Sequence, residues 1–213
     1  MVDMGMFYKL AFGLLRKVSD FWDRLIARRA LLLADEPRTV LDSPCGDGRF
    51  WSLLAEKSDR RIIAADESPN KLVTAWNINT SKVIKRVRLL RTSAFTIDLS
   101  GESVDCIFSM RPFRLVGESS ARLNLLREFH RITRDCLIIS IEVERNPHLC
   151  SNQQSPPEQE KNGDHRILTP PAEIESEFRL AGFIIQQYIV RLPRLDLQRI
   201  YILRKHKIHL HLN

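Results

Sequence analysis

Hydrophobic residues recur at two spacings along this chain, and the alternation between them predicts the fold. Short apolar runs that are typical of buried strands occupy residues 39–42, 61–65, 87–90, 104–110 and 136–143. Helical spacing of three and four residues occupies residues 50–55, 69–78 and 121–132. Strands that alternate with helices predict an α/β fold with a mostly parallel sheet, covered by helices on both faces.

Further elements are expected at both ends of the chain. Apolar residues keep helical spacing over residues 7–33, which predicts one long or two short amphipathic helices packed over the core. Residues 171–181 form a predicted helix that Gly182 ends, and residues 183–190 and 199–203 follow as two strands. We therefore expect a Rossmann-like three-layer sandwich: a mostly parallel seven-stranded sheet with an antiparallel C-terminal strand and an N-terminal helical extension.

The length of 213 residues favours a single domain over residues 1–213. Its expected parts are a helical cap at 1–36, a cofactor-binding half at 37–143, a mobile substrate loop at 144–166, a C-terminal helix and strands at 167–205, and a tail at 206–213. The tail alternates histidines with other residues, but no acid or cysteine lies beside them, so no metal site is predicted.

Composition narrows the partners and the compartment. The chain has no run of eighteen apolar residues and no secretory signal pattern, which predicts a cytoplasmic protein. A formal net charge of +7 suits an anionic partner. The amphipathic N-terminal helix is a candidate for peripheral contact with the inner face of a membrane. No paired cysteine motif is present, which favours free thiols at Cys45, Cys106, Cys136 and Cys150.

The segment that is most informative about function follows the first predicted strand. Asp42 ends that strand, and Gly46 and Gly48 in the next turn let a ligand approach the backbone closely. The helix after the turn has unpaired N–H groups at its start, so a cofactor crevice is expected at this edge of the sheet. Asp66 ends the second strand, where a carboxylate can accept hydrogen bonds from both ribose hydroxyls.

These segments resemble the motifs of class I, Rossmann-like S-adenosylmethionine-dependent methyltransferases, and the chain is similar to the methyltransferase type 11 group. Residues 40–50 resemble the first motif, with Pro44 in place of the usual first glycine. Residues 126–132 and 178–183 resemble the helix before strand five and the final helix-to-strand junction. The GxGxxG turn of dinucleotide-binding proteins is absent. The resemblance implies S-adenosylmethionine as the cofactor.

The same resemblance implies which residues bind that cofactor. Asp66 is expected at the ribose, and Ser93 replaces the acid that meets the adenine amino group in related enzymes. The full set is Asp42, Ser43, Pro44, Cys45, Gly46, Gly48, Arg49, Asp66, Glu67, Ser93, Ala94, Phe95, Ser109, Met110 and Arg111.

Methyl transfer needs an aligned nucleophile and exclusion of water, so a dedicated base is optional. Close members of the family carry an arginine and a pair of histidines after strand four. Here Arg111 is present, whereas Arg114 and Leu115 stand where the histidines are expected. The catalytic candidates are Arg111, Arg114, Glu142 and His148, followed by Glu144 and His165.

We therefore expect methyl transfer to a small-molecule or lipid-linked acceptor, and an anionic acceptor would suit the guanidinium groups of Arg111, Arg114 and Arg145. Two alternatives stay open: a catalytically degenerate scaffold, suggested by Ser93 and the missing histidines, and an RNA methyltransferase, favoured by the basic charge. Nucleic acid ranks lower because residues 109–112 do not form an Asn-Pro-Pro-Tyr type tetrad. The acceptor's identity and the oligomeric state do not follow from the sequence.

Overall fold

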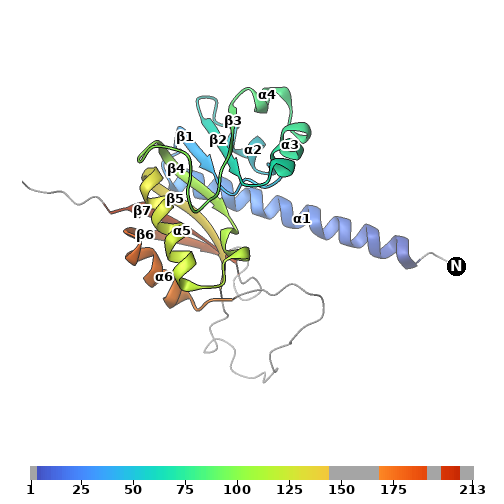
Figure 1. The fold of residues 1–213 in the computed structure, drawn as a ribbon. Helices are drawn as coiled ribbons and strands as arrows, with labels where there is room; N and C mark the ends of the chain where they lie inside the picture. Colours follow the sequence, from blue (N-terminus) through green and yellow to red (C-terminus); the bar gives the residue numbers. More distant parts are fainter. Residues whose placement is uncertain (1–3, 144–167, 191–197, 207–213) are drawn as a thin grey trace, which may run out of the picture.

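Seven strands form one sheet in the order β3-β2-β1-β4-β5-β7-β6 in the computed structural model, which describes residues 4–143, 168–190 and 198–206 (Figure 1). The strands are β1 (Thr39–Asp42), β2 (Arg61–Asp66), β3 (Val87–Arg91), β4 (Val104–Met110), β5 (Thr133–Glu142), β6 (Phe183–Val190) and β7 (Gln198–Lys205).

The pairing confirms the predicted mixture of strand directions. β1 pairs in parallel with β2 and β4, and the parallel pairing continues outward to β3 and β5. β7 runs antiparallel to both β5 and β6. The carboxyl ends of β1, β2 and β4 therefore meet at one edge of the sheet, where ligands bind in folds of this kind.

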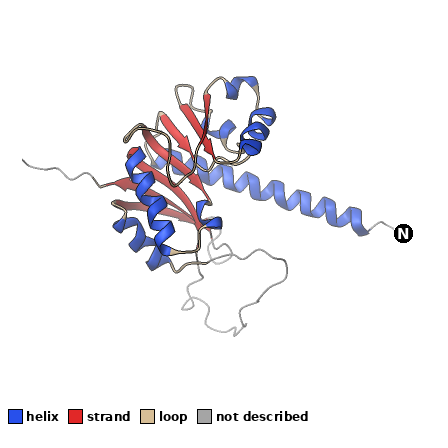
Figure 2. Cartoon of the chain, viewed as in Figure 1, coloured by secondary structure: helices blue, strands red, loops and turns tan. Residues whose placement is uncertain are grey.

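Helices cover both faces of this sheet, as Figure 2 shows, so the predicted three-layer arrangement is confirmed. The helices are α1 (Met4–Leu33), α2 (Trp51–Leu54), α3 (Pro69–Ile78), α4 (Ser81–Ile84), α5 (Ser119–Ile132) and α6 (Pro171–Leu180), with a short 3₁₀ helix, η1 (Pro112–Leu115). The core on one face unites α1 to α4, with Trp51 fully buried among them. The core on the other face belongs to α5 and α6 and contains Phe129 and Phe178.

A loop replaces a helix between β3 and β4. Ile97 in this loop is buried against the core beneath α5, and its backbone N–H donates to Glu128 Oε1 at 2.6 Å. Arg131 donates in return to the carbonyls of Ile97 and Leu99. Two side chains of α5 thus satisfy the backbone of the loop, which lets it cover the sheet without a helix of its own.

α1 is one continuous helix of 30 residues, which decides between the one long and two short helices that the sequence allowed. Its last turns pack on the core through Ile26, Ala27, Ala30 and Leu31. The expectation that the apolar positions of α1 lie over the core is wrong for Phe21, which is 63% exposed. Helical spacing gives the reason: Phe21 lies on the side of α1 opposite Ala27 and Ala30, as does Leu32, which is 59% exposed.

Several sequence predictions fall outside the described residues: the loop over 144–166, most of the tail and Cys150. The other three cysteines are buried free thiols. Within the described ranges, no helix has the length and apolar character needed to cross a membrane. The same ranges contain no cluster of histidine, cysteine and acidic side chains that could hold a metal ion.

Candidate functional site

The turn after β1 is hydrogen-bonded to β4 and β2, the two strands that flank β1. Ser43 N–H donates to the carbonyl of Phe108 in β4 at 3.1 Å, and Cys45 N–H donates to the carbonyl of Ala65 in β2 at 2.8 Å. Ser109 Oγ donates to the Ser43 carbonyl at 2.6 Å, and the Ser43–Pro44 peptide bond is cis. The turn is therefore held at the carboxyl edge of the central strands.

Gly46 and Gly48 serve this turn in different ways, although both have positive φ, at 52° and 68°. A Cβ at Gly48 would lie 2.9 Å from Ala75 Cβ and from the ring of Trp51, so this glycine permits close packing between the turn and α3. A Cβ at Gly46 would meet no heavy atom within 4 Å. Gly46 thus borders open space and exposes its backbone to a ligand.

Two carboxyl groups lie behind the turn. Asp42 is 2% exposed and accepts a hydrogen bond from Trp51 Nε1 at 3.2 Å. Burial raises the pKa of Asp42 to about 8, and repulsion from nearby Asp66 adds to this shift, although the Trp51 hydrogen bond opposes it. Asp42 is therefore mostly protonated at neutral pH.

Asp66 fastens β2 to the glycine turn. Its Oδ2 accepts from Gly46 N–H and its Oδ1 from Ser68 N–H, both at 3.0 Å. Each carboxylate oxygen can accept a further hydrogen bond, so Asp66 retains acceptor capacity for a ligand. Ser68 also begins α3, because its side chain accepts from Lys71 N–H.

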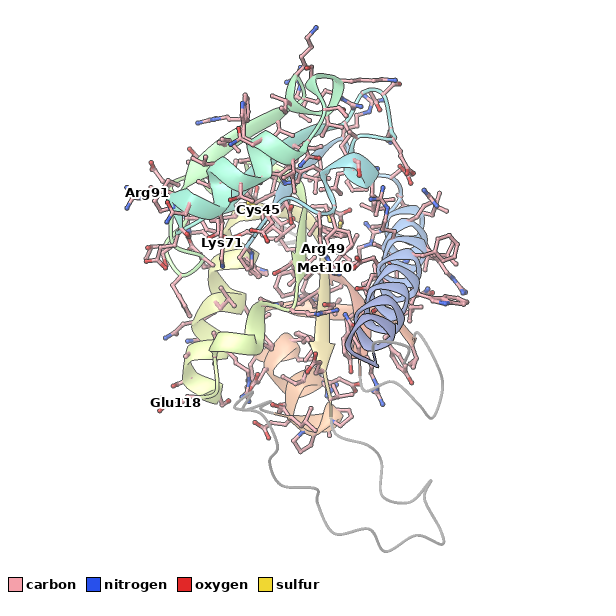
Figure 3. The ribbon with its side chains drawn as sticks, turned by 90° about the vertical axis from the view of Figure 1, so that its right-hand side faces the viewer. Cys45, Arg49, Lys71, Arg91, Met110 and Glu118 are labelled. Carbon is pink, nitrogen blue, oxygen red and sulfur yellow. The ribbon has the colours of Figure 1, made fainter. Side chains whose placement is uncertain are left out.

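These groups surround a cavity of about 420 Å³. It is lined by Asp42, Pro44, Cys45, Gly46, Asp47, Arg49, Phe50, Asp66, Lys71, Met110, Arg111 and Pro112. In Figure 3, Cys45 and Lys71 lie on the α3 side, whereas Arg49 and Met110 lie towards α1. Burial raises the pKa of the Cys45 thiol above its usual range, so it lines the cavity as a neutral group.

An acid from α1 joins two arginines of the cavity wall. Asp23 is 5% exposed, and its Oδ2 lies 2.5 Å from Arg49 Nη2 and 3.2 Å from Arg111 Nη2. Asp20, one turn earlier on α1, lies 3.3 Å from Arg49 Nη1. Arg111 adopts left-handed backbone angles, φ 59° and ψ 46°, and its N–H donates to Ser140 Oγ at 2.9 Å. Two acids of α1 thus contact the arginines of the cavity wall from behind.

Eight of the residues that the resemblance implied for cofactor binding line this cavity: Asp42, Pro44, Cys45, Gly46, Arg49, Asp66, Met110 and Arg111. Ser43, Gly48 and Ser109 are buried and support the turn instead. Glu67 is exposed after β2, and residues 93–95 form a turn after β3 that is not part of the lining. An adenine contact at Ser93, Ala94 or Phe95 stays a prediction.

The catalytic candidates are spread more widely. Arg111 lines the cavity, whereas Glu142 lies half-buried at the end of β5 and is not a lining residue. Arg114 belongs to η1, and its side chain is outside the description. The remaining candidates, which are Glu144, Arg145, His148 and His165, fall outside the described residues.

Sequence reasoning missed five residues of the site: Asp23, Asp47, Phe50, Lys71 and Pro112. A signal existed for Asp47 and Phe50, because both belong to the glycine turn and its helix. Asp23 gave a weaker signal, as an acid in an otherwise basic amphipathic helix. Its two arginine partners are 26 and 88 residues away, so the pairing was not readable from spacing.

A mostly parallel sheet with a glycine turn after β1, a carboxylate after β2 and a cavity beside them is the arrangement of Rossmann-like folds, which often bind nucleoside-containing cofactors at this edge. Residues 40–135 match the model of a methyltransferase domain family. The matched stretch, a little under half of the chain, thus resembles a methyltransferase domain, and the fold is that of S-adenosylmethionine-dependent methyltransferases. A comparison with curated protein sequences found no match.

Solved structures share the fold at low sequence identity. The magnesium protoporphyrin IX methyltransferase of Synechocystis, solved with bound S-adenosylmethionine, is 12% identical at a TM-score of 0.63, covering 87% of this chain and 80% of its own. A Listeria monocytogenes protein described as a putative S-adenosylmethionine-dependent methyltransferase is 14% identical at a TM-score of 0.59, and the match covers 80% of this chain and 92% of that protein. A methyltransferase from Aquifex aeolicus is 19% identical at a TM-score of 0.58, and the match covers 79% of this chain and 82% of that protein.

The residues present fit this cofactor. The open side of Gly46 gives the close backbone approach that the methionine part requires, and Asp66 has acceptor capacity for ribose hydroxyls. Arg49 and Lys71 place cations in the lining, which complement a carboxylate. Phe50 and Met110 add apolar surface to the lining.

Proposed function

We propose that this enzyme transfers a methyl group from S-adenosylmethionine to a small-molecule or lipid-linked acceptor that carries an anionic group. One observation carries the proposal: the cavity that Gly46 and Asp66 border is continuous with a wall formed by Arg49 and Arg111. The residues that would hold the cofactor and the two arginines therefore line the same cavity. An acceptor held by that wall would lie beside the cofactor.

The bound cofactor supplies an electrophilic methyl group on a sulfonium. The protein's share of the work is to hold both reactants in line and to exclude water. Asp66 would accept hydrogen bonds from the ribose, while Phe50, Met110 and Pro112 offer apolar surface against which water is displaced. Arg111 would orient an acceptor anion, because a guanidinium has five N–H donors and can bind Asp23 and a second anion together.

The proposed cofactor binding is tested by isothermal titration of the purified protein with S-adenosylmethionine and S-adenosylhomocysteine. We expect micromolar binding that weakens at least about tenfold in Asp66→Ala, because hydrogen bonds to a charged group contribute about 1.5–3 kcal/mol. Asp98→Ala is the control, since Asp98 is exposed and outside the cavity. Absence of binding by a folded wild type would instead support the degenerate scaffold.

The proposed class of acceptor is tested by transfer of a labelled methyl group into lipid extracts, phosphorylated sugars and RNA. We expect label in lipid or small anionic molecules, and an increased acceptor KM in Arg111→Gln with an unchanged cofactor Kd. Label in RNA alone would reverse the ranking and identify an RNA methyltransferase.

A further inference from the structure

Over residues 19–33, where the side chains of α1 are described, the helix has two apolar faces, and the fold covers one of them. Ile26, Ala27, Ala30 and Leu31 lie in the core. The opposite side, here called the outer face of α1, consists of Phe21, Trp22, Leu25 and Leu32, which are 63%, 38%, 41% and 59% exposed. The spacing of these residues places them along one side of a helix. An apolar strip of this kind on a soluble domain marks a contact surface.

The charges on α1 indicate what that contact surface fits. Residues 4–33 carry six cations and two acids. Both acids, Asp20 and Asp23, bind Arg49 of the cavity wall, and thus place no negative charge on the outer face. Arg29 is exposed and follows Leu25 by four residues, which places it on the same side. A second copy of this basic helix would be repelled, whereas an anionic phospholipid surface complements both the apolar strip and the cations.

The same helix reaches the cavity. Asp23 contacts Arg49 and Arg111, so the segment that carries Phe21 and Trp22 packs against two residues of the cavity wall. In Figure 3, α1 runs along the side of the molecule on which Arg49 and Met110 lie. A surface that contacts the outer face of α1 would therefore lie beside the cavity and not behind the sheet.

We infer that the outer face of α1 docks on an anionic phospholipid bilayer and thereby brings the cavity to lipid-linked acceptors. This inference rests on the proposed function for the choice of acceptor. Phe21 and Trp22, whose rings lie edge to face with centroids 6.3 Å apart, enter the interface with Leu25. Arg29 contacts lipid phosphates. α1 lies in the plane of the surface and does not cross it.

Co-sedimentation with vesicles tests this docking in the full chain. We expect binding to phosphatidylcholine vesicles that contain about one-third phosphatidylglycerol, and weak binding to pure phosphatidylcholine. The double variant Phe21→Gln, Leu25→Gln keeps good helix formers and should bind at least about tenfold less. Its matched control is Val73→Gln, Ile78→Gln, which removes two apolar side chains of α3 that are 58% and 62% exposed and should bind like the wild type.

A second readout follows Trp22 in a Trp76→Phe background, where the only other tryptophan, Trp51, is fully buried. Vesicles should shift its emission to the blue. The inference is wrong if anionic vesicles leave the wild type in solution, if both double variants lose binding equally, or if α1 instead forms a dimer that Phe21→Gln, Leu25→Gln dissociates in sedimentation velocity. Calorimetric binding of S-adenosylmethionine by the same samples shows separately whether the proposed enzyme function fails.

Discussion

Replacing the two glycines of the β1 turn by alanine should separate stability from cofactor binding. Gly46 and Gly48 both have positive φ, so alanine is strained at either position by about 1–2 kcal/mol. They differ in their surroundings. At Gly48 the new methyl group meets Trp51 and Ala75 at 2.9 Å, whereas at Gly46 it meets nothing within 4 Å.

The magnitudes follow from that difference. Overpacking a filled core costs about 1–3 kcal/mol beyond the backbone strain. Gly48→Ala should therefore lower the free energy of unfolding by about 2–5 kcal/mol, and Gly46→Ala by about 1–2 kcal/mol. The order reverses for the cofactor. Gly46 lines the cavity and Gly48 does not, so Gly46→Ala should weaken S-adenosylmethionine binding at least about tenfold and the folded Gly48→Ala much less.

Urea denaturation followed by tryptophan fluorescence measures the first effect, and isothermal titration below the unfolding transition measures the second. The wild type and both single variants are compared in the same buffer. If Gly48→Ala proves as stable as Gly46→Ala, the contact with Trp51 is not tight and the reasoning fails. If Gly46→Ala binds the cofactor like the wild type, the open side of this glycine does not face the ligand.

Three further results are expected. The folded pKa of Asp42 is raised from 3.8 to about 8, so the folded state holds a proton that the unfolded state releases; the stability this contributes is complete below about pH 3.8 and is lost as pH rises to about 8. Asp42→Asn should therefore remove this fall in the free energy of unfolding in urea titrations from pH about 5 to 9. Parallel curves for the wild type and the variant would contradict the reasoning. Glu177→Gln removes the buried carboxylate that lies 2.7 Å from Arg122 Nη2 and leaves the buried guanidinium without that counter-charge. The free energy of unfolding should fall by about 3 kcal/mol in chemical denaturation. The matched Glu173→Gln, at a half-exposed carboxylate, should change stability by less than about 1 kcal/mol, and equal losses would refute the difference in burial.

Much of the fold was readable from the sequence because the relevant signals are local. The run over residues 136–141 is apolar except for Ser140, which is typical of a strand buried on both faces. The acid, turn and helix after β1 are contiguous, so the position of the cofactor site followed from residues 42–50. The strand boundaries were less exact: β5 begins at Thr133, whereas the apolar run begins at Cys136.

The details of the site were decided by packing between distant segments. Ser43 and Ser109 lie in the right motifs, yet they bond to each other beneath the turn, because β1 and β4 are neighbours. Lys71 of α3 lines the same cavity as Met110 and Arg111, which lie far from it in the chain. Neither the pairing nor the lining can be read from sequence separation.

The N-terminal helix shows the same division. Its sequence determined a helix with apolar residues at regular spacing, and hydrophobic periodicity alone carries that information. It did not determine which apolar side meets the core, since both sides of residues 21–32 are apolar. Only the tertiary structure covered Ala27 and Leu31, left Phe21 exposed and brought Asp23 to two arginines. Burial and ion pairing depend on partners that are far away in the chain, and the fold alone brings them together.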